Sequence, residues 1–300
     1  MRSLERELSE RFGSRLAVDC PLAEFTSFRI GGPADLLLTV ETEYELAAAM
    51  AAAHRHGVAM FCLGAGTNLL VSDRGVRGLV VRLGDGFRKI EIEGRKIIAG
   101  AAAQFGALVE AAVERGLGGL EFGEGIPGTV GGGLVMNAGA FGREVARVVT
   151  LVHGVTGEGI ARALSPDEVG FAYRRTQLPP RFVITHVDFE LVPADRDTLR
   201  AKVKEFSAKR AARQPLGAPN AGSIFKNPPG NFAGRLLEAA GLKGERLGGA
   251  AFSERHANFI VNLGGARAAE VRALMELARN KVKQGSGIWL EPEVRLVGDW

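Results

Sequence analysis

Apolar residues recur with a helical period in several segments of the chain. Thr42 and Glu45 have the spacing of a capping box before an alanine-rich segment that stops at Gly57. Ser165 followed by Pro166 indicates the start of a short helix, since the missing N–H of proline costs nothing at the first helical position. The same period predicts further helices over 103–115, 197–213, 231–240 and 266–284.

Between these segments lie strand-like runs, and in several of them apolar and polar residues alternate, as they do in half-buried strands. The runs cover 58–63, 78–83, 88–93, 95–100, 145–152, 182–192 and 288–297. Because clusters of strands are interrupted by helices, an α+β fold is expected rather than a simple doubly wound sheet. Pro193-Ala194-Asp195 ends a long strand before a helix, which predicts one domain over 1–193 and another over 194–300.

The composition is that of an ordinary globular protein. A chain of 300 residues allows about two domains of roughly 150 residues each, and 46% apolar and 24% charged residues fit a folded chain. The formal charge of +4 suits an enzyme that handles anionic molecules but does not require one. Basic residues concentrate in 200–213, where no aromatic pattern or nucleic-acid motif accompanies them, so a solvated helix face is expected.

The cysteines and the N-terminus bear on the compartment. Cys20 and Cys62 lie far apart and form no CxxC pattern, which favours a reducing compartment without disulfides. The charged segment 1–12 does not resemble a signal peptide. No apolar run approaches the roughly 18 residues of a membrane helix, so a cytoplasmic protein without membrane insertion is expected.

A glycine loop follows the predicted strand 58–63. The loop, residues 64–70, reads Gly-Ala-Gly-Thr-Asn-Leu-Leu, and its bare backbone can bring N–H donors to a pyrophosphate. A dinucleotide fingerprint of the Rossmann type requires a third glycine where Leu69 stands and an acid after a second strand. Asp85 falls in a Gly-Asp-Gly turn instead, so the Rossmann interpretation fails, and an ordinary strand turn remains an alternative to phosphate binding.

A second glycine cluster is denser. Ten glycines occur between Gly116 and Gly139, and apolar residues such as Ile126 and Val130 are interleaved with them. Such a run loses much conformational entropy on folding, and its apolar residues argue against a flexible surface loop. The cluster therefore predicts a backbone laid against a flat ligand.

Several motifs, in this order, resemble the UDP-N-acetylenolpyruvoylglucosamine reductase (MurB) family. They are Phe-Arg-Ile-Gly-Gly-Pro-Ala at 28–34, the loop 64–73, Gly-Ile-Pro-Gly-Thr-Val-Gly-Gly at 125–132, Tyr173-Arg174, Ala-Gly-Ser-Ile-Phe-Lys-Asn-Pro at 221–228, His-Ala-Asn-Phe at 256–259 and Leu-Glu-Pro-Glu-Val-Arg at 290–295. Flavoenzymes of the vanillyl-alcohol-oxidase (PCMH) type share the glycine motifs in looser form. The later motifs are more specific, and the resemblance covers roughly residues 20–297.

The resemblance implies an FAD-binding domain of that type over 1–193, in two subdomains split near residue 75, and an α+β substrate-binding domain over 194–300. It further implies noncovalent FAD, NADPH as co-substrate, and reduction of UDP-N-acetylglucosamine enolpyruvate to UDP-N-acetylmuramate. That reaction belongs to peptidoglycan precursor synthesis, and through it to cell-wall formation, cell shape and division. The short segment 174–223 places the chain in the subclass without an extra tyrosine-bearing loop over the substrate, and a monomer is expected.

Three residues are predicted to carry the chemistry. Taken alone, Arg174 beside Arg175 indicates a surface arginine and Ser223 a turn or helix cap, but the resemblance makes Arg174 a stabiliser of the enolate-like intermediate and Ser223 its proton donor. Glu291 and Glu293 share one face of the strand expected over 288–297, where a solvated face is the simpler interpretation. The family's terminal motif indicates Glu293 as the catalytic carboxylate, with Glu291 as the alternative.

The remaining site residues also follow from the resemblance. The residues expected to bind the flavin are Gly64, Ala65, Gly66, Thr67, Asn68, Leu69, Gly125, Ile126, Thr129, Gly131, Gly132 and Asn137. Tyr173 and Lys226 are expected to contact the substrate, and the weaker candidates for substrate contacts are Arg213, Asn227, His256 and Asn258. No metal site is expected, because the histidines do not have the sequence spacing of metal ligands.

Two other functions remain open from the sequence. Another flavin oxidoreductase of the same fold, acting on a sugar or an alcohol, would turn over with oxygen and need no NADPH. A noncatalytic flavin or UDP-sugar sensor would bind ligand without Arg174, Ser223 and Glu293 in productive geometry.

Overall fold

The computed structural model describes all 300 residues and divides the chain into two compact units. Unit 1 comprises residues 1–18, 36–64 and 78–209, and unit 2 comprises residues 19–35, 65–77 and 210–300. Two short N-terminal segments, 19–35 and 65–77, therefore fold with the C-terminal third of the chain. The predicted domains, 1–193 and 194–300, are continuous in sequence and do not include this pattern.

The first sheet has the strand order β1-β2-β5-β3, with β1 (Leu16–Pro21), β2 (Pro33–Val40), β5 (Val76–Leu83) and β3 (Met60–Cys62). Helices α1 (Arg2–Phe12) and α2 (Glu43–Arg55) contribute the apolar residues that pack with it, among them Leu4, Leu8 and Leu46. Thr42 caps α2 as predicted by accepting from Glu45 N–H at 3.2 Å. The Glu45 side chain accepts from the N–H of Glu41 at 2.7 Å.

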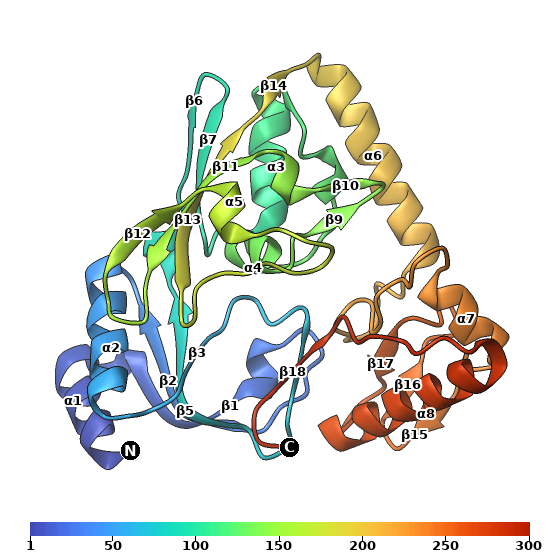
Figure 1. Ribbon diagram of the computed structural model, residues 1–300, viewed down its shortest axis with the longest axis horizontal. Coiled ribbons are helices and arrows are strands. Elements are labelled where there is room, and N and C mark those ends of the chain that lie inside the picture. Colours follow the sequence, from blue (N-terminus) through green and yellow to red (C-terminus); the bar gives the residue numbers. More distant parts are fainter. The chain divides into compact units, whose positions relative to one another are not determined.

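The second sheet of unit 1 is antiparallel, in the order β12-β11-β13-β7-β6 (Figure 1). Its strands are β6 (Ile90–Glu93), β7 (Lys96–Gly100), β11 (Val149–Val155), β12 (Ala161–Leu164) and β13 (Val183–Glu190). Helices α3 (Phe105–Glu114) and α4 (Val130–Val135) pack on one face, where Ile97, Val187 and Phe189 are buried with Phe105 and Leu134.

The remaining elements of this part of the chain are short, apart from one long helix. The short ones are β8 (Leu117–Gly118), β9 (Gly139–Ala140), β10 (Arg143–Glu144), β14 (Val192–Pro193) and α5 (Pro166–Val169). Helix α5 starts after Ser165 as predicted, and Ser165 and Glu168 form a capping box there. Helix α6 (Arg196–Arg213), drawn in gold in Figure 1, begins in unit 1 and ends in unit 2.

Unit 2 has its own core. A sheet of β15 (Arg246–Leu247), β16 (Ala250–Phe252) and β17 (Ile260–Asn262) packs with α7 (Ala233–Ala239) and α8 (Ala268–Ser286) around Phe225, Phe252 and Leu274. Strand β4 (Leu69–Val71) pairs in parallel with β18 (Arg295–Val297). Asp73 accepts from the N–H groups of Ala268 and Ala269 at 2.7 and 3.0 Å, and so caps α8.

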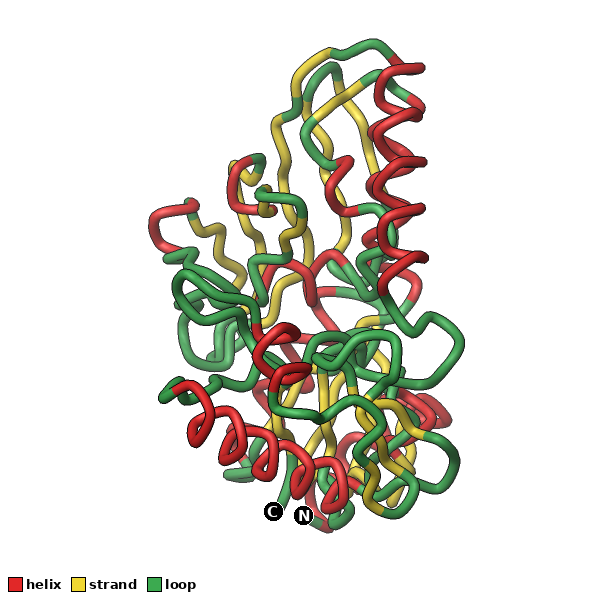
Figure 2. Tube along the Cα trace, turned by 90° about the vertical axis from the view of Figure 1, so that its right-hand side faces the viewer, coloured by secondary structure: helices red, strands yellow, loops and turns green.

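Most predicted helices and strands are confirmed within a few residues, and the α+β class holds. The strand predicted over 288–297 is wrong for most of its length, because only Arg295–Val297 forms a strand. Pro292 lacks an N–H, and the backbone around it pairs irregularly with residues 224–226. Helices α1 and α4 were not predicted. Helices are plain in Figure 2, and none has the length and apolar character needed to cross a bilayer.

Candidate functional site

The first glycine loop turns sharply between β3 and β4. Gly66 has φ +63°, and a Cβ there would overlap the carbonyl oxygen of Phe25, so the position requires glycine. The carbonyl of Gly66 accepts from the N–H of Ser27 at 3.2 Å, which fixes the loop. The N–H groups of Ala65 and Gly66 have no acceptor within the protein. The loop can therefore offer them to an anionic group.

The second glycine cluster uses its backbone differently. Gly128 has φ +116°, and Thr129 then caps α4 by accepting from the N–H of Gly132 at 3.2 Å. The N–H of Gly131 donates to Ala101 at 2.9 Å, and a Cβ on Gly131 would lie 3.0 Å from the Cβ of Ala101. At this end of α4 the bare backbone thus permits close packing on the sheet, and these N–H groups are already engaged.

Asn137 is fully buried just beyond α4. Its side-chain amide donates to the carbonyl of Ala172 at 3.1 Å, and its side-chain oxygen accepts from the N–H of Ala146 at 3.1 Å. The backbone of Asn137 has φ +42°, which asparagine tolerates better than most residues. Its side chain therefore joins three loop segments of unit 1.

Arg174 lies in a loop that is anchored to the glycine-rich segment. Its Nη2 donates to the carbonyl of Gly139 at 2.8 Å, and its guanidinium lies 5.3 Å from the ring centre of Tyr173. Arg174 also has φ +56°, an uncommon conformation for a side chain of this size. Thr176 fastens the same loop by donating to the carbonyl of Val135 at 3.1 Å. These contacts place the Arg174 guanidinium beside the end of the second glycine cluster.

Ser223 follows a fixed turn in unit 2. Gly222 has φ +74°, and its N–H donates to the side chain of Asn220 at 2.9 Å. On the other side, Asn258 is buried and pairs with both backbone groups of Phe225, at 3.0 and 2.8 Å. The half-buried Ser223 is thereby held between two asparagine-anchored points. The Asn220 contact was not predicted, although Asn two residues before Gly is a recognised turn signal.

Glu293 lies on the backbone segment next to Ser223. Its N–H donates to the carbonyl of Ile224 at 2.8 Å, and its carbonyl accepts from the side chain of Asn68 at 3.1 Å. Glu291 instead points its carboxylate to Lys226 Nζ at 2.5 Å and is 70% exposed. The two glutamates therefore differ: Glu291 forms an ion pair at the surface, whereas Glu293 is half-buried near Ser223.

Among the weaker candidates for substrate contacts, some bond to the backbone and one is exposed at the surface. Asn227 accepts from the N–H of Ala233 at 3.0 Å and so caps α7. His256 accepts from the N–H of Asn258 at 3.1 Å, and burial lowers the pKa of its imidazole below the usual value. Arg213 is exposed at the end of α6. Of these residues, Asn227 and His256 have clear roles in positioning the backbone.

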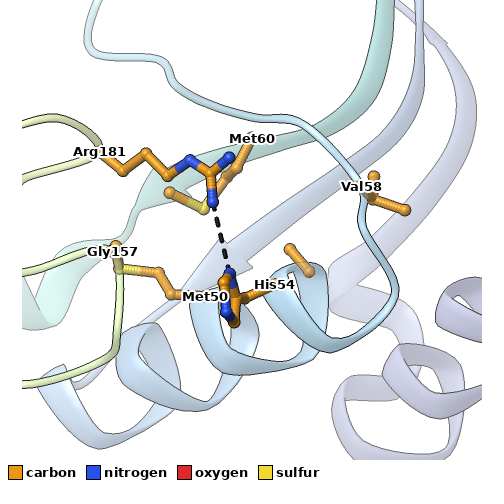
Figure 3. Close-up of a pocket in the computed structure, with 7 residues that line it drawn as sticks. Met50, His54, Val58, Met60, Gly157 and Arg181 are labelled. Atoms are coloured by element: carbon orange, nitrogen blue, oxygen red, sulfur yellow. Dashed lines mark hydrogen bonds between the residues drawn. The ribbon is translucent and has the colours of Figure 1, made fainter.

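The predicted site residues fall in both units. Gly64, Ile126, Thr129 and Arg174 belong to unit 1, whereas Gly66, Ser223 and Glu293 belong to unit 2. A cavity of about 10 Å³ beside His54 and Arg181, shown in Figure 3, has room for one water molecule at most. A cavity of about 450 Å³ in unit 2 lies by Asp73, Arg272 and Trp300. Neither cavity is lined by a residue of the predicted site.

Comparison with known proteins gives two family matches. The family described as "FAD binding domain" matches residues 34–165, and the family described as "UDP-N-acetylenolpyruvoylglucosamine reductase, C-terminal domain" matches residues 214–297. UDP-N-acetylenolpyruvoylglucosamine reductase 2 of Symbiobacterium thermophilum is 49% identical over 93% of this chain and 91% of its own length. The enzyme of Rubrobacter xylanophilus is 46% identical over 94% of this chain and 95% of its own length.

Solved structures give the same result. The crystal structure of the reductase (MurB) from Thermus caldophilus has a TM-score of 0.82 and 37% identity, and the match covers 94% of this chain and 98% of that one. A variant of berberine bridge enzyme is 13% identical with a TM-score of 0.50, over 64% of this chain and 44% of that one. This second likeness concerns the fold alone, and it agrees with the predicted PCMH-type flavin domain.

Proposed function

The chain belongs to the UDP-N-acetylenolpyruvoylglucosamine reductase family, and from this premise we propose that it reduces UDP-N-acetylglucosamine enolpyruvate to UDP-N-acetylmuramate. One structural observation carries the proposal furthest. The segments that bear Ser223 and Glu293 are joined by the hydrogen bond from Glu293 N–H to the carbonyl of Ile224. A hydroxyl and a carboxylate that are held on adjacent backbone suit proton delivery to a substrate carbon.

The chain contains an FAD-binding domain, and the first glycine loop fits this cofactor. The free N–H groups of Ala65 and Gly66 suit the diphosphate of a noncovalently held FAD. Thr129 and Gly132 lie within the second glycine cluster, where their hydrogen bond to each other caps α4. The bound flavin supplies the hydride, which amino-acid side chains cannot supply. We take NADPH as the reductant, from the resemblance to the family.

The protein's own residues then deal with charge and protons. As the substrate gains electrons, negative charge grows on its α-carbon and carboxylate, and the permanent charge of Arg174 stabilises it. Ser223 Oγ gives its proton to the α-carbon. Glu293 assists the protonation of the enol intermediate by Ser223. Lys226 and Tyr173 contribute to substrate binding. Hydrogen bonds from Asn220 and Asn258 keep the Ser223 segment in position.

The physiological setting belongs to the same proposal. The product is a precursor of peptidoglycan, so the enzyme acts in the cytoplasm in support of wall growth, cell shape and division. The short segment 174–223 supports assignment to the subclass without a tyrosine-bearing loop. A monomer suffices for this scheme, because every residue that it uses is supplied by one chain.

Anaerobic mixing tests the function. The purified protein is expected to show a flavin spectrum that bleaches with NADPH and recovers when UDP-N-acetylglucosamine enolpyruvate is added. Product formation is followed by mass spectrometry. A reduced flavin that reoxidises with oxygen but not with the enolpyruvyl sugar would favour an oxidase of the same fold. A flavin that NADPH cannot bleach would contradict the proposal.

A further inference from the structure

Two histidines and an aspartate meet on one face of the antiparallel sheet. His153 of β11 lies opposite His186 of β13, and their rings stack with centroids 4.0 Å apart and planes 10° apart. Asp188 is two residues beyond His186 and therefore shares its face. One possible ligand atom from each of the three residues lies within 4.8 Å of the others. The strand pairing creates this cluster, which the spacing in the sequence does not reveal.

The cluster contains polar atoms whose bonding is incomplete. Asp188 has a side chain that is only 5% exposed, and its Oδ1 is buried without a hydrogen-bond partner. The Nε2 of His153 is also buried without a hydrogen-bond partner, and it lies 3.5 Å from Asp188 Oδ2. Lys96 Nζ contacts the other carboxylate oxygen of Asp188, Oδ2, at 2.9 Å. Buried polar atoms are rarely left unpaired, because their lost hydration is not replaced.

We propose that His153, His186 and Asp188 bind a divalent transition-metal ion, with Zn²⁺ as the best match. Two imidazoles and one carboxylate form a donor set that zinc accepts, with a fourth tetrahedral position left for water. Asp188 Oδ1 and His153 Nε2 are both buried without a hydrogen-bond partner, and the 3.5 Å contact of His153 Nε2 with Asp188 Oδ2 already brings these two residues together. Zinc ligands lie about 2.0–2.2 Å from the ion, so binding requires rotation of these side chains from their present separations of up to 4.8 Å.

The surroundings of His186 support the same assignment. Its Nδ1 lies 3.2 Å from Thr185 Oγ1 and 3.5 Å from Oε1 of Glu43, which is in the first turn of α2. Metal-binding histidines commonly donate their second ring N–H to a carboxylate, which orients the ring. Glu43 can play this part, so that Nε2 of His186 faces the ion. The ion would then connect β11, β13 and α2.

Lys96 opposes the ion, because its ammonium group neutralises Asp188 when no metal is bound. The pairing with Asp188 is also the main reason that the pKa of Lys96 lies above its usual value. Metal binding must turn this side chain, which is 42% exposed, away into solvent. Lys96 is therefore expected to weaken the site without abolishing it.

The test uses the flavin-loaded, tag-free protein after treatment with a chelator. Titration calorimetry with Zn²⁺ and visible absorbance with Co²⁺ are expected to report one bound ion, and Zn²⁺ should raise the unfolding temperature, since it binds the folded chain. His153→Gln and Asp188→Asn should each weaken binding about tenfold or more. Lys96→Gln should tighten it several-fold.

Two histidines outside the cluster provide matched controls. His54 accepts from Arg181 at 3.4 Å (Figure 3), and His56 contacts Glu7 at 2.8 Å, so His54→Gln and His56→Gln should bind the ion like the parent chain. Loss of binding in either control would move the site elsewhere and overturn the proposal. So would an unmodified protein that binds no ion, unchanged affinity in His153→Gln, or binding that is no tighter in Lys96→Gln.

Discussion

The backbone N–H of Glu293 donates a 2.8 Å hydrogen bond to the carbonyl oxygen of Ile224, the residue that follows Ser223. Residues far apart in the chain are thus held on adjacent segments, and Asn258 fixes the same region by pairing with both backbone groups of Phe225. The proton donor and the carboxylate proposed for the reaction therefore share one rigid support within unit 2.

Glu293→Gln is expected to slow the oxidation of the reduced flavin by the enolpyruvyl sugar about 100-fold, because a catalytic carboxylate is lost. Glu291→Gln is the matched change, since Glu291 is 70% exposed and paired with Lys226. It should slow the same step less than about threefold, as exposed ion pairs contribute little. Stopped-flow absorbance measures both variants. If Glu291→Gln slowed this step more than Glu293→Gln did, Glu291 rather than Glu293 would be the catalytic carboxylate.

Prediction from the sequence succeeded where the signal is local. Thr42, Ser165 and the apolar periods indicated helix starts and strands that the structure contains. The strand expected over 288–297 failed because alternation around Pro292 does not show that residues 224–226 bind this backbone irregularly. The failure comes from pairing between segments that are far apart in the sequence.

The site was predictable only in part for the same reason. The motifs name Ser223 and Glu293 as candidates, and their roles stay a prediction. The motifs did not reveal that Asn220 supports Gly222, or that the N–H groups of Gly131 and Gly132 are bonded within the protein. Placement of 19–35 and 65–77 in unit 2 also depends on long-range contacts. Such contacts leave no periodic mark on a single sequence.

Arg174→Lys is expected to retain a positive charge but to lose the planar guanidinium that donates to the carbonyl of Gly139 at 2.8 Å. Oxidation of the flavin by the sugar should slow about 100-fold, the scale of losing one preorganised donor, with flavin reduction by NADPH little changed. Exposed Arg175→Lys is the neighbouring control. Equal rates in Arg174→Lys and the parent chain would remove Arg174 from the chemistry.

Gly66→Ala should impair flavin retention. A methyl group at this position would overlap the carbonyl of Phe25, and φ +63° is strained for alanine. Gly106 in α3 has open space around it, so Gly106→Ala should keep the flavin and stabilise the helix by up to about 1 kcal/mol. Flavin content per protein is read from absorbance after gel filtration. Full flavin content in Gly66→Ala would argue against a role for this loop.

Arg15 and Glu45 predict a pH-dependent contribution to stability. Two hydrogen bonds of 2.7 Å from Arg15 are the main reason that the pKa of Glu45 is lowered from 4.5 to about 2. Because the folded pKa is the lower one, the contribution is complete above about pH 4.5 and is lost as the pH falls toward 2. Discounted for partial exposure, Glu45→Gln should cost roughly 1–2 kcal/mol at neutral pH.

Urea unfolding of Glu45→Gln and the parent chain at several pH values measures this difference. The two curves should converge as the pH falls. Glu10→Gln is the control, because Glu10 is 74% exposed and lies 3.9 Å from Arg6, so its effect should stay within about 0.5 kcal/mol. A Glu45→Gln deficit that persists undiminished near pH 2 would assign it to packing rather than to charge.

The most direct test of the proposed mechanism is the separate measurement of the two half-reactions in Ser223→Ala. Flavin reduction by NADPH should proceed within about twofold of the parent rate, because proton delivery to the sugar is not part of that step. Oxidation of the reduced flavin by UDP-N-acetylglucosamine enolpyruvate should slow by about 10²–10⁴-fold, the range for loss of a general acid. If both steps slow equally, or if neither slows, Ser223 is not the proton donor and the mechanism is wrong.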